Sequence, residues 1–60
     1  MERYNVNDMV VVVKENDRNK GKKCKVIKVI NLIHFPATIY RVEFENGQKH
    51  DYFFGDIWHK

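Results

Sequence analysis

The chain has 60 residues, of which 43% are hydrophobic and 32% charged, and a formal net charge of +3. A chain this short forms a single domain and buries only about 60% of the surface that its unfolded form exposes, so it has little core to devote to a cofactor cavity. Its apolar content is too high for intrinsic disorder. We therefore expect one folded domain over residues 1–60, with no cofactor and no small-molecule substrate.

Cysteine usage and hydropathy indicate the compartment. Cys24 is the only cysteine, so neither an internal disulfide nor a zinc framework can form, and a reducing environment fits best. Residues 1–5 lack the basic and then apolar pattern of a signal peptide, and no apolar run approaches the roughly 20 residues of a membrane span. These features predict a cytoplasmic protein that does not bind membranes.

The charges are distributed unevenly along the chain. Residues 14–28 contain seven Lys and Arg residues against two carboxylates, whereas the rest of the chain contains four against six. The net charge of +3 is therefore a basic segment of about +5 on a mildly acidic body, which favours an anionic partner. A lysine-rich loop that only keeps the protein in solution is the alternative interpretation.

The first half of the chain has two β-rich runs separated by a loop. Four consecutive valines in residues 9–13 favour a strand, and we expect Val10 and Val12 to point inward. Residues 15–23 combine turn formers with charges and predict a loop. Residues 24–30 resume a β-rich run in which apolar residues come as adjacent pairs, and this predicts a bulge or a strong bend where a long strand turns round a barrel corner. A helix is the alternative, which the β-branched residues of this run disfavour.

The second half contains the clearest hairpin. Residues 31–37 include Pro36 and are expected to form a loop or an edge. Residues 38–45 alternate strictly, and Asn46-Gly47 after them is a strong hairpin signal, so residues 48–54 should form the returning strand. A short turn, of 3₁₀ type, then folds Ile57 back onto the barrel. The predicted core comprises Val10, Val12, Val26, Val29, Tyr40, Val42, Phe44, Phe53 and Ile57.

The order of these parts resembles a known fold family. Asn7-Asp8-x-Val10-x-Val12, then Lys20-Gly21-Lys22-Lys23-Cys24-Lys25-Val26, and later Tyr40-x-Val42-x-Phe44-x-Asn46-Gly47 resemble the SH3-like barrels of the KOW and Tudor kind. Asn7 and Cys24 stand where KOW modules often carry glycine. The resemblance covers roughly residues 6–58 and implies an all-β fold, a small SH3-like barrel of about five antiparallel strands.

The resemblance and the charge pattern indicate the same contact surface. In KOW-like domains the loop between the first two strands often contacts nucleic acid or the transcription and translation machinery. Clustered lysines also bind a phosphate backbone by releasing counterions, and exposed aromatic rings add base stacking. The candidate cations are Lys14, Arg18, Lys20, Lys22, Lys23 and Lys25, and the candidate stacking residues are Tyr4, Phe35, Tyr52 and Trp58.

Three other functions fit the sequence less well, and a fourth, inhibition of a host protein, is the main alternative. An aromatic methyl-lysine cage has no signature in the spacing of the aromatic residues, and a polyproline-binding groove lacks its usual acidic loop. Cys24 with a histidine could imitate a nucleophile and its base, but its position at the start of a strand favours a packing role, and we expect no enzyme activity. A small basic barrel of phage or mobile-element type that binds and inhibits a host protein, through an acidic or apolar surface of that partner, is the main alternative.

Overall fold

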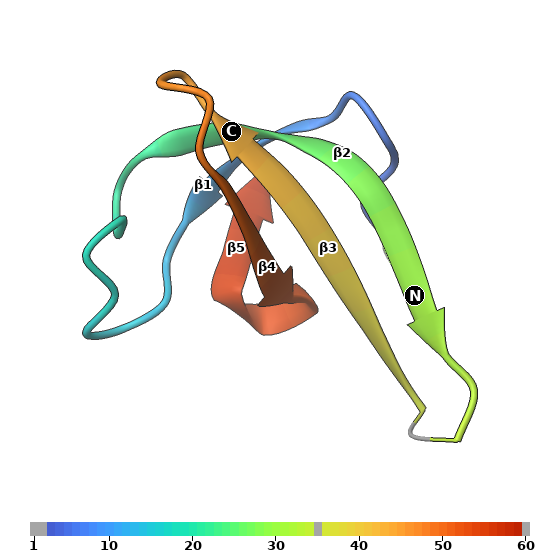
Figure 1. Ribbon diagram of the computed structural model, residues 1–60. Helices are drawn as coiled ribbons and strands as arrows, with labels where there is room; N and C mark the ends of the chain where they lie inside the picture. The colour runs from blue at the N-terminus through green and yellow to red at the C-terminus, as the bar shows by residue number, and fades with distance from the viewer. Residues whose placement is uncertain (1–2, 35, 60) are drawn as a thin grey trace.

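Five strands and one short 3₁₀ turn account for most of the chain. The computed structural model describes residues 3–34 and 36–59. The strands are β1 (Met9–Val12), β2 (Lys23–Leu32), β3 (Ala37–Phe44), β4 (Lys49–Phe53) and β5 (Ile57–His59), and the 3₁₀ turn η1 (Phe54–Asp56) precedes β5. All neighbouring strands are antiparallel and form one sheet in the order β4-β3-β2-β1-β5. The expected all-β barrel of about five antiparallel strands is confirmed (Figure 1).

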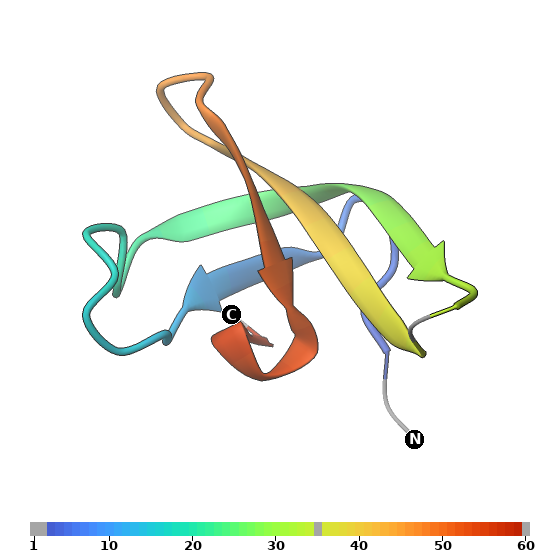
Figure 2. The same cartoon turned by 60° about the horizontal axis from the view of Figure 1, so that its bottom comes forward.

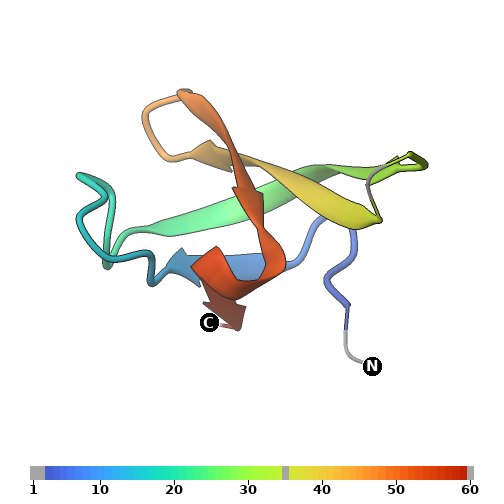
Figure 3. The same cartoon turned by 90° about the horizontal axis from the view of Figure 1, so that it is seen from below.

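The long strand β2 bends, which brings the two halves of the sheet face to face. Its first residues, Lys23 to Lys25, pair with β1, and residues from Cys24 to Leu32 pair with β3. The register with β3 shifts between Val26 and Lys28, so Ile27 is the extra residue of the predicted bulge. Figures 2 and 3 show the result, in which β1 and β5 pass beneath β3 and β4. A bulge increases the local twist, and here it lets a single sheet enclose its own core.

Strand β3 forms one hairpin with β4 and another with β2, and the sequence predicts the first better than the second. At Asn46-Gly47, the Gly47 amide donates to the Phe44 carbonyl at 2.9 Å, and Gly47 has a φ of +90°, which glycine adopts without strain. This predicted hairpin is confirmed. The segment 31–37 is instead part strand, because β2 continues to Leu32 and β3 begins at Ala37. Proline is tolerated there because it lies in the turn between the strands, where no ladder hydrogen bond is needed.

The core consists of the inward-facing residues of all five strands. Val10, Val12, Val26, Tyr40, Val42, Phe44 and Ile57 are buried as predicted, and Val29 packs against them. The prediction for Phe53 is wrong, because its side chain is 51% exposed and Tyr52 is buried in its place. The register explains the exchange: Tyr52 lies opposite Tyr40, and directly opposed residues share a face of the sheet.

The segment before β1 closes one side of the core. Tyr4 is only 2% exposed, its hydroxyl donates to the Ile57 carbonyl at 3.2 Å, and its ring packs edge-on to Tyr40 and stacks on Phe54. The chain reaches β1 through a turn in which the Asn5 amide donates to the Asp8 carboxylate at 2.7 Å. Tyr4 therefore adds to the small core a large side chain from outside the strands.

Replacing Phe44 with alanine should lower the free energy of unfolding by about 3–5 kcal/mol, because a buried phenyl ring is lost and a cavity remains. This is a large part of the roughly 3–9 kcal/mol expected for a domain of this size. Phe53→Ala provides the control, since its ring is half exposed, and should cost less than about 1 kcal/mol. Urea denaturation followed by tryptophan fluorescence measures both; equal losses would show that the inner face is assigned wrongly.

Candidate functional site

The predicted cations surround the connection between β1 and β2. Lys14, Arg18, Lys20 and Lys22 lie in the loop of residues 13–22, while Lys23 and Lys25 begin β2, and all six are exposed. We refer to them as the six loop cations. Figures 1 and 2 show this loop at one end of the molecule and the β2–β3 turn at the other. Four of the cations thus lie in the expected loop between the first two strands, and Lys23 and Lys25 continue from it into β2.

The backbone of this loop is held by hydrogen bonds at both ends and across its middle. At its base the Val12 amide donates to the Lys22 carbonyl at 3.1 Å, and the Gly21 amide donates to the Val12 carbonyl at 2.8 Å. Within the loop, the Lys20 amide donates to the Asp17 carbonyl at 3.0 Å. Gly21 has a φ of +89°, which explains why glycine occupies this position. The loop therefore presents its lysines from an ordered backbone.

Asp17 anchors the loop to β4. One of its carboxylate oxygens accepts from the Asn19 amide at 2.7 Å and from the Tyr52 hydroxyl at 3.3 Å. Asn19 and Tyr52 are both buried, at 4% exposure each. Burial raises the pKa of the Tyr52 phenol, so the hydroxyl keeps its proton and remains a donor at neutral pH. One of the two acidic residues of the loop is thus used to fix its shape.

Most of the six loop cations have no carboxylate partner in the described part of the chain. Lys20 pairs with Glu15 at 2.7 Å, and both side chains are largely exposed, so the pair contributes little to stability. The other ion pairs of the described residues, Arg41 with Asp51 and Lys49 with Glu43, lie on β3 and β4. Five of the loop cations are therefore available to an anion from solution.

The strand register adds an exposed tryptophan to these cations. On β1, Val11 lies opposite Lys23 of β2 on one side and opposite Trp58 of β5 on the other, and Met9 lies opposite Lys25. Opposed residues share a face of the sheet, so these side chains form one outward patch. Trp58 is 61% exposed and Met9 47%. We call Met9, Val11, Lys23, Lys25 and Trp58 the outer patch.

Carboxylates border the outer patch on the side away from Trp58. A broad hollow lies between the start of β2 and the β3–β4 turn, and its lining includes Lys22, Lys23 and Lys25 but also Glu43 and Glu45. The positive charge therefore dominates toward β1 and β5 and is balanced toward β3. An anionic chain would follow the side that carries Trp58.

Two of the predicted stacking residues are not available at the surface. The rings of Tyr4 and Tyr52 are buried at 2% and 4% exposure, so the prediction that they stack on bases is wrong. Both have hydroxyl partners inside the protein, as expected for buried tyrosines. The period-two pattern from Tyr40 across the hairpin could have placed Tyr52 inside, but no local signal marks Tyr4. Phe35 lies outside the described residues, and Trp58 is exposed as the stacking role requires.

Cys24 is a core residue and not a nucleophile poised at the surface. Its side chain is 2% exposed, and burial raises the pKa of the thiol to about 11, so it is protonated at neutral pH. Among the described residues there is also no group of three or more His, Cys, Asp or Glu side chains that could hold a metal ion. No helix in the described part of the chain is long and apolar enough to cross a membrane. Among the predicted site residues that the structure describes, the exposed ones are the six loop cations and Trp58.

Comparisons with protein-family models, with curated proteins and with solved structures found no match to this chain.

Replacing Tyr52 with phenylalanine should destabilise the protein by about 1–2 kcal/mol, because Asp17 loses a hydrogen bond to its charged form. Hydrogen exchange of the amides of residues 19–22 should quicken, while amides in the middle of β2 and β3 keep their protection. Tyr40→Phe is the control, since the Tyr40 hydroxyl has no hydrogen-bond partner among the described residues. Equal behaviour of the two variants would contradict the anchoring role of Tyr52.

The stability of the protein should fall in alkaline solution through Cys24. The unfolded chain ionises this thiol near pH 8.5, whereas the folded chain keeps its proton up to about pH 11. The contribution of Cys24 is therefore complete below about pH 8.5 and is lost as the pH rises through about 11, by roughly 2–3 kcal/mol at most. Denaturation of the wild type and Cys24→Ala between pH 7 and about pH 10.5 measures it, and parallel curves would disprove it.

Proposed function

We propose that this protein is a non-enzymatic binding module that contacts single-stranded nucleic acid through the six loop cations and Trp58. The observation that carries the proposal is the juxtaposition of an exposed indole ring with unpaired lysines on one face of the sheet. We also propose that the chain is a small barrel of the KOW kind, which its sequence resembles.

The cations provide the affinity for the phosphate backbone. Lysines that neutralise phosphates release the counterions condensed on the nucleic acid, and this term does not depend on base sequence. Because Asp17 and Tyr52 hold the loop in place, its lysines lose little backbone freedom on binding. Lys23 and Lys25 follow alternate positions of β2, so their ammonium groups lie along one line of the outer patch.

Trp58 provides the preference for single strands. A base can stack on an exposed indole only when it has left its own stack, which is already the case in single-stranded DNA or RNA. The ring is flanked by Val11 and faces away from the core, so no rearrangement of the described residues is needed to expose it. Sequence preference should be weak because every base has a π-face.

The composition of the outer patch also favours a second candidate, an acidic protein partner. Trp58, Val11 and Met9 form an apolar centre beside Lys23 and Lys25, and an apolar centre with a polar rim is typical of protein interfaces. A host protein inhibited by a small accessory protein is a partner of this kind. The two candidates use the same residues and differ in their dependence on salt and on phosphate.

We expect the logarithm of the affinity for short single-stranded oligonucleotides to fall linearly with the logarithm of the salt concentration. Changing Lys22, Lys23 and Lys25 together to glutamine should reduce this slope by about 2, at roughly 0.7 per phosphate contact. Trp58→Ala should weaken binding by about 1–3 kcal/mol and leave the slope unchanged. Fluorescence anisotropy with labelled DNA and RNA strands, and with the matching duplexes, measures these effects.

A charge-matched pair of variants controls for net charge. Lys23→Glu and Lys49→Glu change it equally, but Lys49 lies on β4, at the opposite edge of the sheet from Trp58. Lys23→Glu should weaken binding strongly and Lys49→Glu only slightly. Absence of binding at low salt, or equal effects of the two variants, would overturn the nucleic-acid proposal. A single lysate protein captured by the wild type and lost with Trp58→Ala would then support the protein partner.

A further inference from the structure

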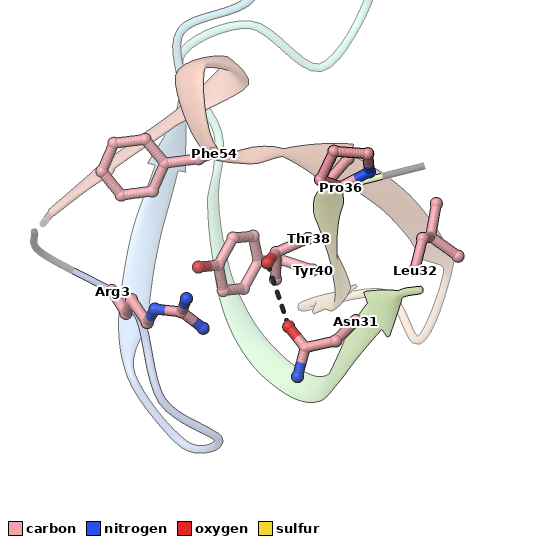
Figure 4. A pocket seen from close by; sticks show the side chains of 8 residues that line it. Arg3, Asn31, Leu32, Pro36, Thr38, Tyr40 and Phe54 are labelled. Atoms are coloured by element: carbon pink, nitrogen blue, oxygen red, sulfur yellow. Dashed lines mark hydrogen bonds between the residues drawn. The ribbon is translucent and has the colours of Figure 1, made fainter. Parts of the chain in front are cut away.

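A second concave site lies between the N-terminal segment, η1 and the end of the β2–β3 hairpin. It has a volume of about 540 Å³, and its lining includes Arg3, Asn31, Leu32, Thr38, Tyr40 and Phe54. Figure 4 shows Arg3, Tyr40 and Phe54 on one side of the pocket and Leu32 with Pro36 on the other. The six loop cations line none of it, so this pocket is separate from the surface discussed above.

The Tyr40 hydroxyl is a polar group without a partner in this pocket. Tyr40 is 1% exposed, and its ring is held edge-on by Tyr4 at 5.4 Å and tilted against Phe54 at 6.5 Å. The hydroxyl bonds to no described residue, yet no fully buried side-chain polar atom in the described part of the chain lacks a partner. The hydroxyl therefore opens onto the pocket, and in Figure 4 it points to the side of Arg3.

The other polar groups of the pocket are also donors. Arg3 is exposed and forms no ion pair with a described carboxylate, and it lines the same pocket as Tyr40. Asn31 uses its oxygen to accept from the Thr38 hydroxyl at 3.0 Å, which leaves its NH₂ group to donate. A guanidinium, a phenol and an amide thus present donors to the same small space, with apolar walls on either side.

We propose that this pocket binds a carboxylate joined to an aromatic or branched apolar group, as in the last residue of a peptide chain or a free arene carboxylate. The planar guanidinium fork of Arg3 matches the two oxygens of a carboxylate, and the Tyr40 hydroxyl adds a further donor. The apolar group lies between Phe54 and the wall made by Leu32 and Pro36. The site goes beyond the nucleic-acid surface and requires none of its residues.

The charge of the lining selects against other ligands. A methylated or free ammonium group would meet Arg3, a like charge, and no described residue of the lining is a carboxylate that could offset it. A phosphate dianion would find one cation among the described lining residues, whereas a carboxylate matches that cation in charge. The aromatic rings of Tyr4, Tyr40 and Phe54 therefore do not form a cage for a cation.

Titration of the ¹⁵N-labelled protein with N-acetyl-phenylalanine tests the proposal. We expect shifts of the backbone amides of Thr38 and Tyr40 and of the Asn31 side-chain amide. The neutral N-acetyl-phenylalaninamide should bind at least about tenfold more weakly, because a hydrogen bond to a charged group is worth about that factor. Arg3→Gln and Tyr40→Phe should each weaken binding of the acid by a similar factor. Phenylacetate, which lacks the acylated amine of N-acetyl-phenylalanine, distinguishes the two sources of ligand. Binding as tight as that of N-acetyl-phenylalanine indicates a free carboxylate that bears an aryl group, and weaker binding indicates a peptide terminus.

Two controls make the test decisive. Arg18→Gln removes a cation of the loop and should leave the affinity for N-acetyl-phenylalanine unchanged. Tyr40→Phe keeps the aromatic ring and loses no hydrogen bond of the described residues, so it should melt like the wild type. Equal binding of the acid and its amide, full affinity of Arg3→Gln, or shifts confined to residues 13–25 would each overturn the proposal. Binding of inorganic phosphate as tight as that of the acid would do so as well.

Discussion

The bend of β2 at Ile27 is the feature on which the rest of the structure depends. In a flat five-stranded sheet of this length, the apolar face would stay exposed to water, because the described part of the chain has no α-helix to cover it. The bulge turns β2 so that its first part pairs with β1 and residues from Cys24 to Leu32 pair with β3. The inner residues Val10, Val26 and Val42 then meet one another across a single core.

Three of the eight acidic residues of this basic protein shape turns. Asp8, Asp17 and Asp56 each accept from a backbone amide two or three residues away, and Asp17 also holds Tyr52. Asp51 pairs with Arg41 on the outer face, which keeps the pKa of that carboxyl below its ordinary value. Among the described residues, most lysines between positions 14 and 25 have no such partner. The acidic residues thus hold turns or pair with cations, whereas most lysines of residues 14–25 face solvent.

The two proposed sites share no residue and depend on different parts of the fold. The outer patch is assembled by the pairing of β5 with β1 and of β1 with β2, so it depends on the order of the strands. The pocket is assembled by packing, because Tyr4 and Phe54 bring the N-terminal segment and η1 against Tyr40. Since Tyr4 also donates to the Ile57 carbonyl, the closure of the pocket is linked to the position of β5.

Local patterns in the sequence determined strands β1 to β4, the Asn46-Gly47 hairpin, the irregularity in β2 and the exposure of the six loop cations, but not strand β5. Those features arise from neighbouring residues: β-branched runs, period-two alternation, turn chemistry and charges that cannot be buried without partners. Only the tertiary structure decided that Tyr4 is inside, because no local pattern marks this residue and its hydroxyl bonds to the Ile57 carbonyl, 53 positions away. The register of β4 with β3 also placed Tyr52 in the core where Phe53 was expected. The placement of Trp58 and Lys23 on either side of Val11, and of Arg3 and Tyr40 in one pocket, was likewise decided there. Each pair joins segments more than 30 residues apart, and no pattern within either segment encodes the distance between them.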